Sequence, residues 1–351
     1  MKKFFTICVF ALASIASALA DGVSIAPFTI AAGETQDVDI VLEDEGGVYV
    51  SAQFNLYLPD GIGIVYDGTA YAYTSPHYGS SFVGVSKRTD RDGNDYYQFY
   101  LEDRMMNPLG AGTMFTVTLE ATDMVSTGVQ TGYIRSVSLV DEMGGGPDIA
   151  ELTYDVTTSV DVTVSDLGYA SFSWPRTLDF SDSGIQAFIG TRYANGSLLM
   201  SEVTVVPANT GVILKGAAGT YNPQTTDGPG DDVTENILTG TGSSSYTVQD
   251  GDNIYVLSNL NGAGLYFADP GVTVGAHKAY LALDGGTDAK DGGVSLDFNT
   301  TGIGAPAVVT DAAMMRNSYS QGIYTIDGRR VCSENLKKGL YISNGKKVLV
   351  K

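Results

Sequence analysis

Apolar and polar side chains alternate along most of the chain after residue 20. Between Val48 and Leu58, every even position is apolar and the odd positions are polar or tyrosine. Successive side chains of a β-strand point to opposite faces, so this spacing predicts a strand with one buried side and one solvent-facing side. The segments Phe115–Ala121, Val160–Val164 and Val294–Phe298 repeat the pattern. Helical spacing is nearly absent, and the chain is therefore predicted to be all-β.

Turn-forming pairs separate the alternating segments. Asp-Gly and Asn-Gly tolerate the positive φ angles of tight hairpin turns. They begin at Asp60, Asp67, Asp92, Asn195, Asp250, Asn261, Asp284, Asp291, Asp327 and Asn344. Many short strands between such turns are typical of sandwiches and barrels. We therefore expect two β-sandwich-like domains in tandem, followed by a short C-terminal β-hairpin tail.

Composition suggests where these parts begin and end. The expected parts are a signal peptide at 1–20, a first sandwich at 21–165, a second β-rich domain at 166–300, a linker at 301–315 and a basic tail at 316–351. The stretch Tyr154–Ser165 has the alternation of a strand that closes the first domain. Gly, Ala and Pro without any periodicity mark the linker.

The first twenty residues have the pattern of a signal peptide. Lys2 and Lys3 precede an apolar run that closes with Ala18-Leu19-Ala20, a pattern that signal peptidase cleaves. An uncleaved membrane anchor is the alternative, although polar residues interrupt the run and no later stretch is long enough to span a membrane. Cleavage before Asp21 leaves Cys332 as the single cysteine, so the exported chain is stabilised by burial and not by an internal disulfide. The expected location is the cell surface or the extracellular space.

The charge is acidic overall and unevenly distributed. Forty acidic against 20 basic residues give a net charge of −20, which disfavours nucleic acid and anionic lipid as partners. Residues 21–315 carry a formal charge of −28, whereas residues 316–351 carry +6. The basic tail is therefore expected to be exposed. It can meet an export apparatus or dock onto the protein's own acidic surface.

Residues with catalytic or metal-binding chemistry are scattered. His77 and His277 lie in separate predicted domains, and Cys332 has no neighbouring histidine to activate it. The acidic segment Asp90–Asp95 resembles a calcium loop only in part, because Gly stands fourth and Leu101 stands where a bidentate Glu is needed. It is interpreted as a hairpin turn. We expect no catalytic residue, no metal site and no cofactor.

Tyrosines supply the strongest sign of binding. Tyr71, Tyr73 and Tyr78 lie in a segment rich in Thr, Ser and Gly, and Tyr96 and Tyr100 follow on the next predicted strand. Tyrosine rings can stack on sugars or fill interface pockets. These five residues are the predicted binding residues, with an ordinary core or surface role as the alternative for about half of the aromatic residues here.

The first domain resembles cohesins, β-sandwich modules that bind dockerin domains. The resemblance lies in Val48–Leu58 followed by Pro59-Asp60-Gly61, in Gly110–Leu119, in Ile134–Asp141 and in a final strand near Val160–Val164. It implies a dockerin-like protein partner, and no position here matches a dockerin-contact motif. The tail, through Tyr324–Val331 and Lys338–Val348, resembles the C-terminal sorting segments of proteins that Bacteroidetes export by type IX (Por) secretion.

Together, these features favour a non-catalytic exported protein whose first domain presents a binding face to a protein or a glycan. Two alternatives remain open. One is a carboxylate-dependent glycan hydrolase, whose two acidic residues cannot be paired from spacing alone. The other is a fimbrial or otherwise polymerising subunit.

Overall fold

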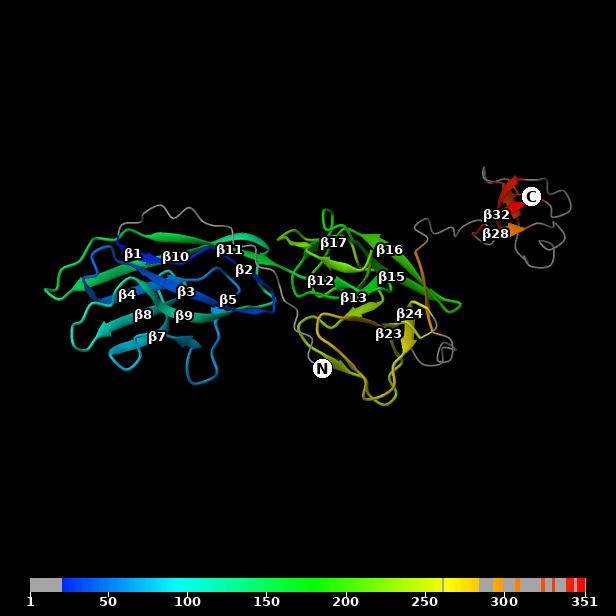
Figure 1. Ribbon diagram of the computed structural model, residues 1–351. Helices are drawn as coiled ribbons and strands as arrows, with labels where there is room; N and C mark the ends of the chain where they lie inside the picture. Colours follow the sequence, from blue (N-terminus) through cyan, green and yellow to red (C-terminus); the bar gives the residue numbers. More distant parts are fainter. Residues whose placement is uncertain are drawn as a thin grey trace. The chain divides into compact units, whose positions relative to one another are not determined.

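The computed structural model describes residues 21–260, 262–283 and 293–298, together with the strand segments 307–309, 323–325, 330–331, 339–343 and 346–350. Every regular element in this part of the chain is a β-strand (Figure 1), so the predicted all-β class is confirmed. The described residues include no helix capable of crossing a membrane. The predicted signal peptide, Cys332 and most of the predicted linker lie outside the described residues.

The chain divides into two compact units, one ending at Ser159 and the other beginning at Val160. This division comes earlier than the expected domain end at residue 165. Strand β12 (Val162–Val164), which was expected to close the first domain, instead pairs with β19 (Gly219–Tyr221). Alternation shows that a segment is a strand, but it does not show which sheet edge the strand joins.

The first unit contains two sheets. One has the order β1-β3-β9-β5, with β6 also paired to β9, and the other has the order β2-β11-β10-β4-β8-β7. The bounds in the first sheet are β1 (Gly22–Ser24), β3 (Thr35–Glu43), β5 (Ile62–Ile64), β6 (Tyr73–Thr74) and β9 (Gly112–Ala121). Those in the second, six-stranded sheet are β2 (Phe28–Ala31), β4 (Tyr49–Tyr57), β7 (Ser81–Thr89), β8 (Asp95–Asp103), β10 (Gly128–Asp141) and β11 (Leu152–Ser159). The pairing is antiparallel except between β2 and β11.

A single apolar core joins the two sheets. Phe54 of β4 stacks on Phe99 of β8 with ring centroids 4.9 Å apart, and Phe115 of β9 meets Phe99 edge-on at 4.9 Å. All three rings are fully buried, and each such burial contributes about 1.5–3 kcal/mol. Because side chains of both sheets meet in this core, the first unit is a β-sandwich.

The second unit is also built from packed sheets. A five-stranded sheet has the order β13-β18-β15-β16-β27, and a four-stranded sheet has the order β21-β26-β23-β24. Their bounds are β13 (Tyr169–Phe172), β15 (Gln186–Ala194), β16 (Ser197–Val203), β18 (Val212–Lys215), β27 (Ser295–Asp297), β21 (Leu238–Gly240), β23 (Ile254–Ser258), β24 (Gly264–Phe267) and β26 (Ala279–Ala282). Phe188 and Leu198 of the larger sheet share a core with Tyr255 and Leu281 of the smaller one.

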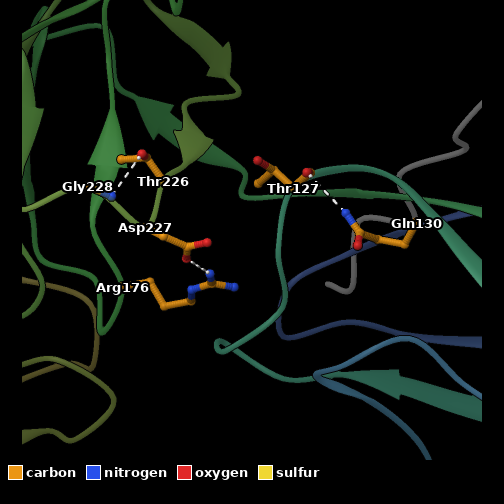
Figure 2. Close-up of polar contacts among 6 residues, drawn as sticks. All are labelled: Thr127, Gln130, Arg176, Thr226, Asp227 and Gly228. Atoms are coloured by element: carbon orange, nitrogen blue, oxygen red, sulfur yellow. Dashed lines mark hydrogen bonds and ion pairs between the residues drawn. The ribbon is translucent and has the colours of Figure 1, made fainter.

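Smaller sheets complete this unit. β12 pairs with β19, β14 lies between β17 and β20, and β22 pairs with β25. The remaining bounds are β14 (Leu178–Asp179), β17 (Val205–Val206), β20 (Gln224–Thr225), β22 (Tyr246–Thr247) and β25 (Thr273–Val274). Arg176 donates to the Asp227 carboxylate at 3.1 Å, and the backbone N–H of Gly228 donates to the Thr226 hydroxyl (Figure 2).

The C-terminal strands form their own sheet, with the order β28-β32-β31-β29-β30. Their bounds are β28 (Ala307–Val309), β29 (Ile323–Thr325), β30 (Arg330–Val331), β31 (Gly339–Ser343) and β32 (Lys346–Val350). β31 and β32 pair antiparallel, as the sequence predicts for a hairpin. β28 lies within the predicted linker yet pairs in parallel with β32, so this part of the linker is a strand.

Candidate binding face

The solvent-facing side of strands β10, β4, β8 and β7 in the first unit, here called the outer face, is the candidate site. The outer face arises from the alternation of apolar and polar residues along the strands, because Phe54 and Phe99 point into the core while their sequence neighbours point outward. The strand register brings the outward residues into rows across the sheet. One row contains Arg135, Asn55, Gln98 and Ser86, and the next contains Ser138, Gln53, Tyr100 and Gly84.

Three tyrosines and an arginine form a stack along one edge of the outer face. The Arg135 guanidinium lies 4.8 Å from the ring centroid of Tyr57 and 4.9 Å from that of Tyr133. On the β8 side, Tyr96 stacks on Tyr57 at 5.2 Å. Arg135 Nε also donates to Glu151 Oε2, which raises the pKa of the guanidinium and fixes its position. The Tyr57 ring is therefore contacted from both neighbouring strands.

Tyr100 has a different environment. Its hydroxyl end lies over the backbone of Gly84 on β7, where a Cβ atom would come within 2.2 Å of ring atom Cε1 and 2.3 Å of Cζ. Only glycine permits this approach, because any side chain would push the ring away. Since 45% of Tyr100 remains exposed, one side of the ring covers the strand and the rest is open to solvent.

Amides lie on one side of Tyr100, and the charged Glu102 lies on the other, two residues along β8. Gln53 stands opposite Tyr100 on β4, and Asn55 stands opposite Gln98 of β8. Asn55 Oδ1 is buried and has no hydrogen-bond partner among the described residues. A buried polar atom in this state is costly unless something donates to it.

The structure does not bring the five predicted tyrosines together. Tyr96 and Tyr100 lie on the outer face, whereas Tyr71 and Tyr73 pack against the core. Tyr71 meets Tyr97 edge-on at 5.4 Å, and Tyr73 stacks on Tyr78 at 5.8 Å. Burial, followed by a hydrogen bond with Tyr78, raises the pKa of Tyr73 to about 12. Tyr78 itself is 55% exposed.

Several residues of the outer face were not predicted from the sequence. Tyr57, Gln53 and Asn55 stand at the odd positions of the first alternating segment, so their outward direction could be read. The positions of Tyr133 and Arg135 beside Tyr57 depend on the register between β10 and β4, which no local pattern shows.

A pocket of about 700 Å³ adjoins the Tyr57 end of the outer face. Residues from the face, from the ends of β7, β8 and β10 and from nearby turns line it, and they include Tyr57, Tyr133, Arg135, Asp60, Lys87, Asn94, Asp95 and Gln130. Lys87 Nζ pairs with Asp95 Oδ2 at 2.7 Å. Gln130 Nε2 donates to the Thr127 carbonyl at 3.4 Å (Figure 2).

Two carboxylates near this pocket, Asp90 and Asp95, are stabilised in their ionised form. The Lys87 ammonium, followed by the Thr89 hydroxyl, lowers the pKa of Asp95. Asp90 occupies the hairpin turn between β7 and β8, and hydrogen bonds led by the backbone N–H of Asn94 lower its pKa. A glycosidase needs one carboxyl group with a raised pKa to act as general acid. The pKa values of Asp90 and Asp95 are instead lowered.

The two histidines lie in different units. His77 is half-buried in a loop of the first unit, where desolvation lowers its pKa despite the nearby Asp103. His277 contacts Trp174 in the second unit, with ring centroids 4.3 Å apart. Trp174 is buried and also stacks on Phe172, so it anchors this unit's interior.

No family model and no curated protein matches the chain. The solved structures that resemble it include cohesin modules. A cohesin from Archaeoglobus fulgidus is 14% identical with a TM-score of 0.29, and the match covers 39% of this chain and 90% of that one. A chain of a type I cohesin–dockerin complex from Clostridium thermocellum is 16% identical with a TM-score of 0.31, over 40% and 99% of the two chains. A cohesin module of a Clostridium perfringens family 33 glycoside hydrolase is 14% identical with a TM-score of 0.31, over 39% and 96%. Likeness at this level does not identify a ligand.

Proposed function

We propose that the first unit is a non-catalytic binding module of an exported protein, and that its ligand contacts the outer face. The observation that carries the proposal is the outer face itself, where partly exposed aromatic rings and uncharged amides lie on a rigid sheet. Tyrosine and arginine are enriched in binding surfaces. The side chains of Tyr133, Arg135, Tyr57 and Tyr96 restrict one another through their mutual contacts, so binding would immobilise few further rotamers.

The cohesin resemblance in the sequence adds a candidate partner, a dockerin-like protein, and the aromatic and amide residues also suit a glycan. The proposal is tested by immobilising residues 21–351 and measuring how much polysaccharide, and how much protein from the organism's own secreted fraction, the immobilised chain captures. We expect specific capture that falls at least tenfold, or about 1.4 kcal/mol, when Gln53, Gln98 and Tyr100 are all replaced by Ala. Capture unaffected by this variant, or polysaccharide cleavage abolished by Asp60→Asn or Asp95→Asn, would contradict the proposal.

Export is the second part of the proposal. The predicted signal peptide directs the chain out of the cytoplasm, and the basic tail at 316–351 acts as a type IX sorting segment. Deleting residues 316–351 is then expected to leave folded protein in the periplasm, as fractionation would show. If the tail docks onto the acidic body instead, the deletion permits normal export and reduces stability, an effect that high salt reproduces in the full chain.

A further inference from the structure

We infer that the ligand of the outer face is a neutral glycan, and that one of its sugar rings stacks on Tyr100. This inference rests on the proposed function, since it assigns a ligand class to the same face. It follows from three independent features of the face: the position of one ring, the chemistry of the groups around it and the placement of charge.

The first feature is the Tyr100 ring. Because its hydroxyl end lies over Gly84, the strand backbone covers one side of the ring and leaves the rest open. A sugar presents a face of C–H groups that packs flat against an aromatic face of this kind. Tyr57 is less suited, because Arg135 and Tyr96 already contact its ring from the two neighbouring strands.

The second feature is the amide set. Each amide of Gln53, Asn55 and Gln98 offers both donors and an acceptor, which matches a hydroxyl that donates one hydrogen bond and accepts others. These residues lie beside Tyr100 in the register, so a sugar stacked there brings its hydroxyls within their reach.

The third feature is charge. Glu102, two residues from Tyr100 on β8, places a negative charge beside the ring. Two cations also lie on this face: Arg135, which pairs with Glu151, and Arg88, opposite Tyr96. The chain as a whole has a net charge of −20 and repels polyanions. An acidic polysaccharide is thus disfavoured, and a neutral one matches the amides and the open ring.

The face also has room for more than one sugar. Tyr96 and Tyr100 are four residues apart on β8, which is about 13 Å along a strand. Beyond Tyr57 and Tyr133, the pocket of about 700 Å³ continues this path. We therefore expect affinity to rise from monosaccharide to oligosaccharide.

A protein partner fits the centre of the face less well. Protein interfaces are most apolar at their buried core and polar at their rim. On this face Gln53, Gln98 and Glu102 adjoin Tyr100 directly, and the exposed Phe82 stands opposite Glu102, so polar and charged groups interrupt an apolar centre. The experiment below must therefore distinguish a protein ligand of the outer face from a glycan ligand.

The test is affinity electrophoresis of residues 21–351 in gels containing β-glucan, xylan, galactomannan, starch or polygalacturonate. We expect at least one neutral polysaccharide to retard the chain, with at least tenfold weaker binding for Tyr100→Ala and for the double variant Gln53→Ala/Gln98→Ala. Tyr78→Ala is the matched control, because Tyr78 is similarly exposed but stacks on Tyr73 away from these amides. Unchanged circular dichroism verifies that each variant is folded. The double variant keeps Tyr100, so it tests the face even if removing the Tyr100 ring disturbs β7.

Three results would overturn the inference: no retardation by any neutral gel, binding to polygalacturonate alone, or retardation that both outer-face variants retain. The proposed function fails separately. If secreted protein is captured in a Tyr100-dependent way without glycan binding, the face is a protein site and only the glycan assignment is wrong. If neither polysaccharide nor protein capture depends on the outer face, both are wrong.

Discussion

The inner and outer faces of the six-stranded sheet use aromatic rings in different ways. Phe54 and Phe99 stack on the inner face with no exposure, and their rings hold the two sheets together. On the outer face, Tyr57 and Tyr96 stack with ring centroids 5.2 Å apart, against 4.9 Å for the phenylalanines, but remain partly exposed, and Tyr100 covers a glycine. The contrast shows that the number of aromatic residues does not mark a site. What matters is the face on which the strand places them.

The largest expected effect separates neighbouring residues of β4. Phe54→Ala is expected to lower the free energy of unfolding by about 3–5 kcal/mol, because it opens a cavity in the core. Asn55→Ala, its neighbour on the outer face, is expected to leave stability unchanged or to raise it, since it removes a buried unpartnered oxygen. Urea denaturation measures the free energy of unfolding of each variant. Similar losses would mean that the two faces do not differ in this way.

A second substitution acts on the outer face through the backbone. Gly84→Ala places a Cβ within 2.3 Å of the Tyr100 ring, so the ring must move away from the strand. Ligand capture is expected to fall about tenfold, or about 1.4 kcal/mol, with a smaller loss of stability. Gly275→Ala is the control, because a Cβ there meets no atom within 4 Å. Undiminished capture by Gly84→Ala would show that the position of the ring is unimportant.

Alkaline titration tests the burial of Tyr73, which lies on β6 and packs against the core. Burial raises the pKa of Tyr73 to about 12, whereas a tyrosine in the unfolded chain ionises near 10. The folded state therefore holds this proton above pH 10 and the unfolded state releases it, so the stabilising contribution is complete below pH 10 and is lost as the pH rises toward 12. Tyr73→Phe is expected to make the decline in stability between pH 10 and 12 shallower. An unchanged slope in denaturant titrations would argue against a buried, neutral Tyr73.

The smallest expected effect concerns the ion pair at the margin of the pocket. Lys87 and Asp95 are both substantially exposed, and such pairs contribute about 0–1 kcal/mol. Lys87→Ala is expected to lower the free energy of unfolding by less than about 1 kcal/mol, and added salt is expected to reduce the difference further. A larger, salt-independent loss would indicate that Lys87 supports the hairpin through packing.

The local features of this architecture could be predicted from the sequence. Alternation distinguishes Phe54 from Asn55, and it places Tyr97 and Phe99 on the face opposite Tyr96 and Tyr100, because the period of a strand is a property of neighbouring residues. The hairpin turn between β7 and β8 could likewise be read from Asp92-Gly93.

Long-range pairing could not be read in the same way. Val162–Val164 has the same alternation whichever sheet edge it joins, and the structure pairs it with Gly219–Tyr221. The outer face depends on the register between β10 and β4, which shifts at a bulge between Arg135 and Ser138, where Ser136 has a positive φ of 54°. A shift of one residue would reverse which side chains face outward, and no local pattern fixes it.

The most direct test of the binding face follows the side-chain amide signals of Gln53, Asn55 and Gln98 by NMR. Residues 21–351 are titrated with an oligosaccharide prepared from whichever neutral polysaccharide retards the chain. We predict that these three pairs of NH₂ signals and the backbone signal of Gly84 shift together in a saturable way, while the backbone signals of Tyr71 and Tyr73 stay in place. Shifts confined to Tyr71 and Tyr73, or no saturable shift on the outer face, would contradict the account.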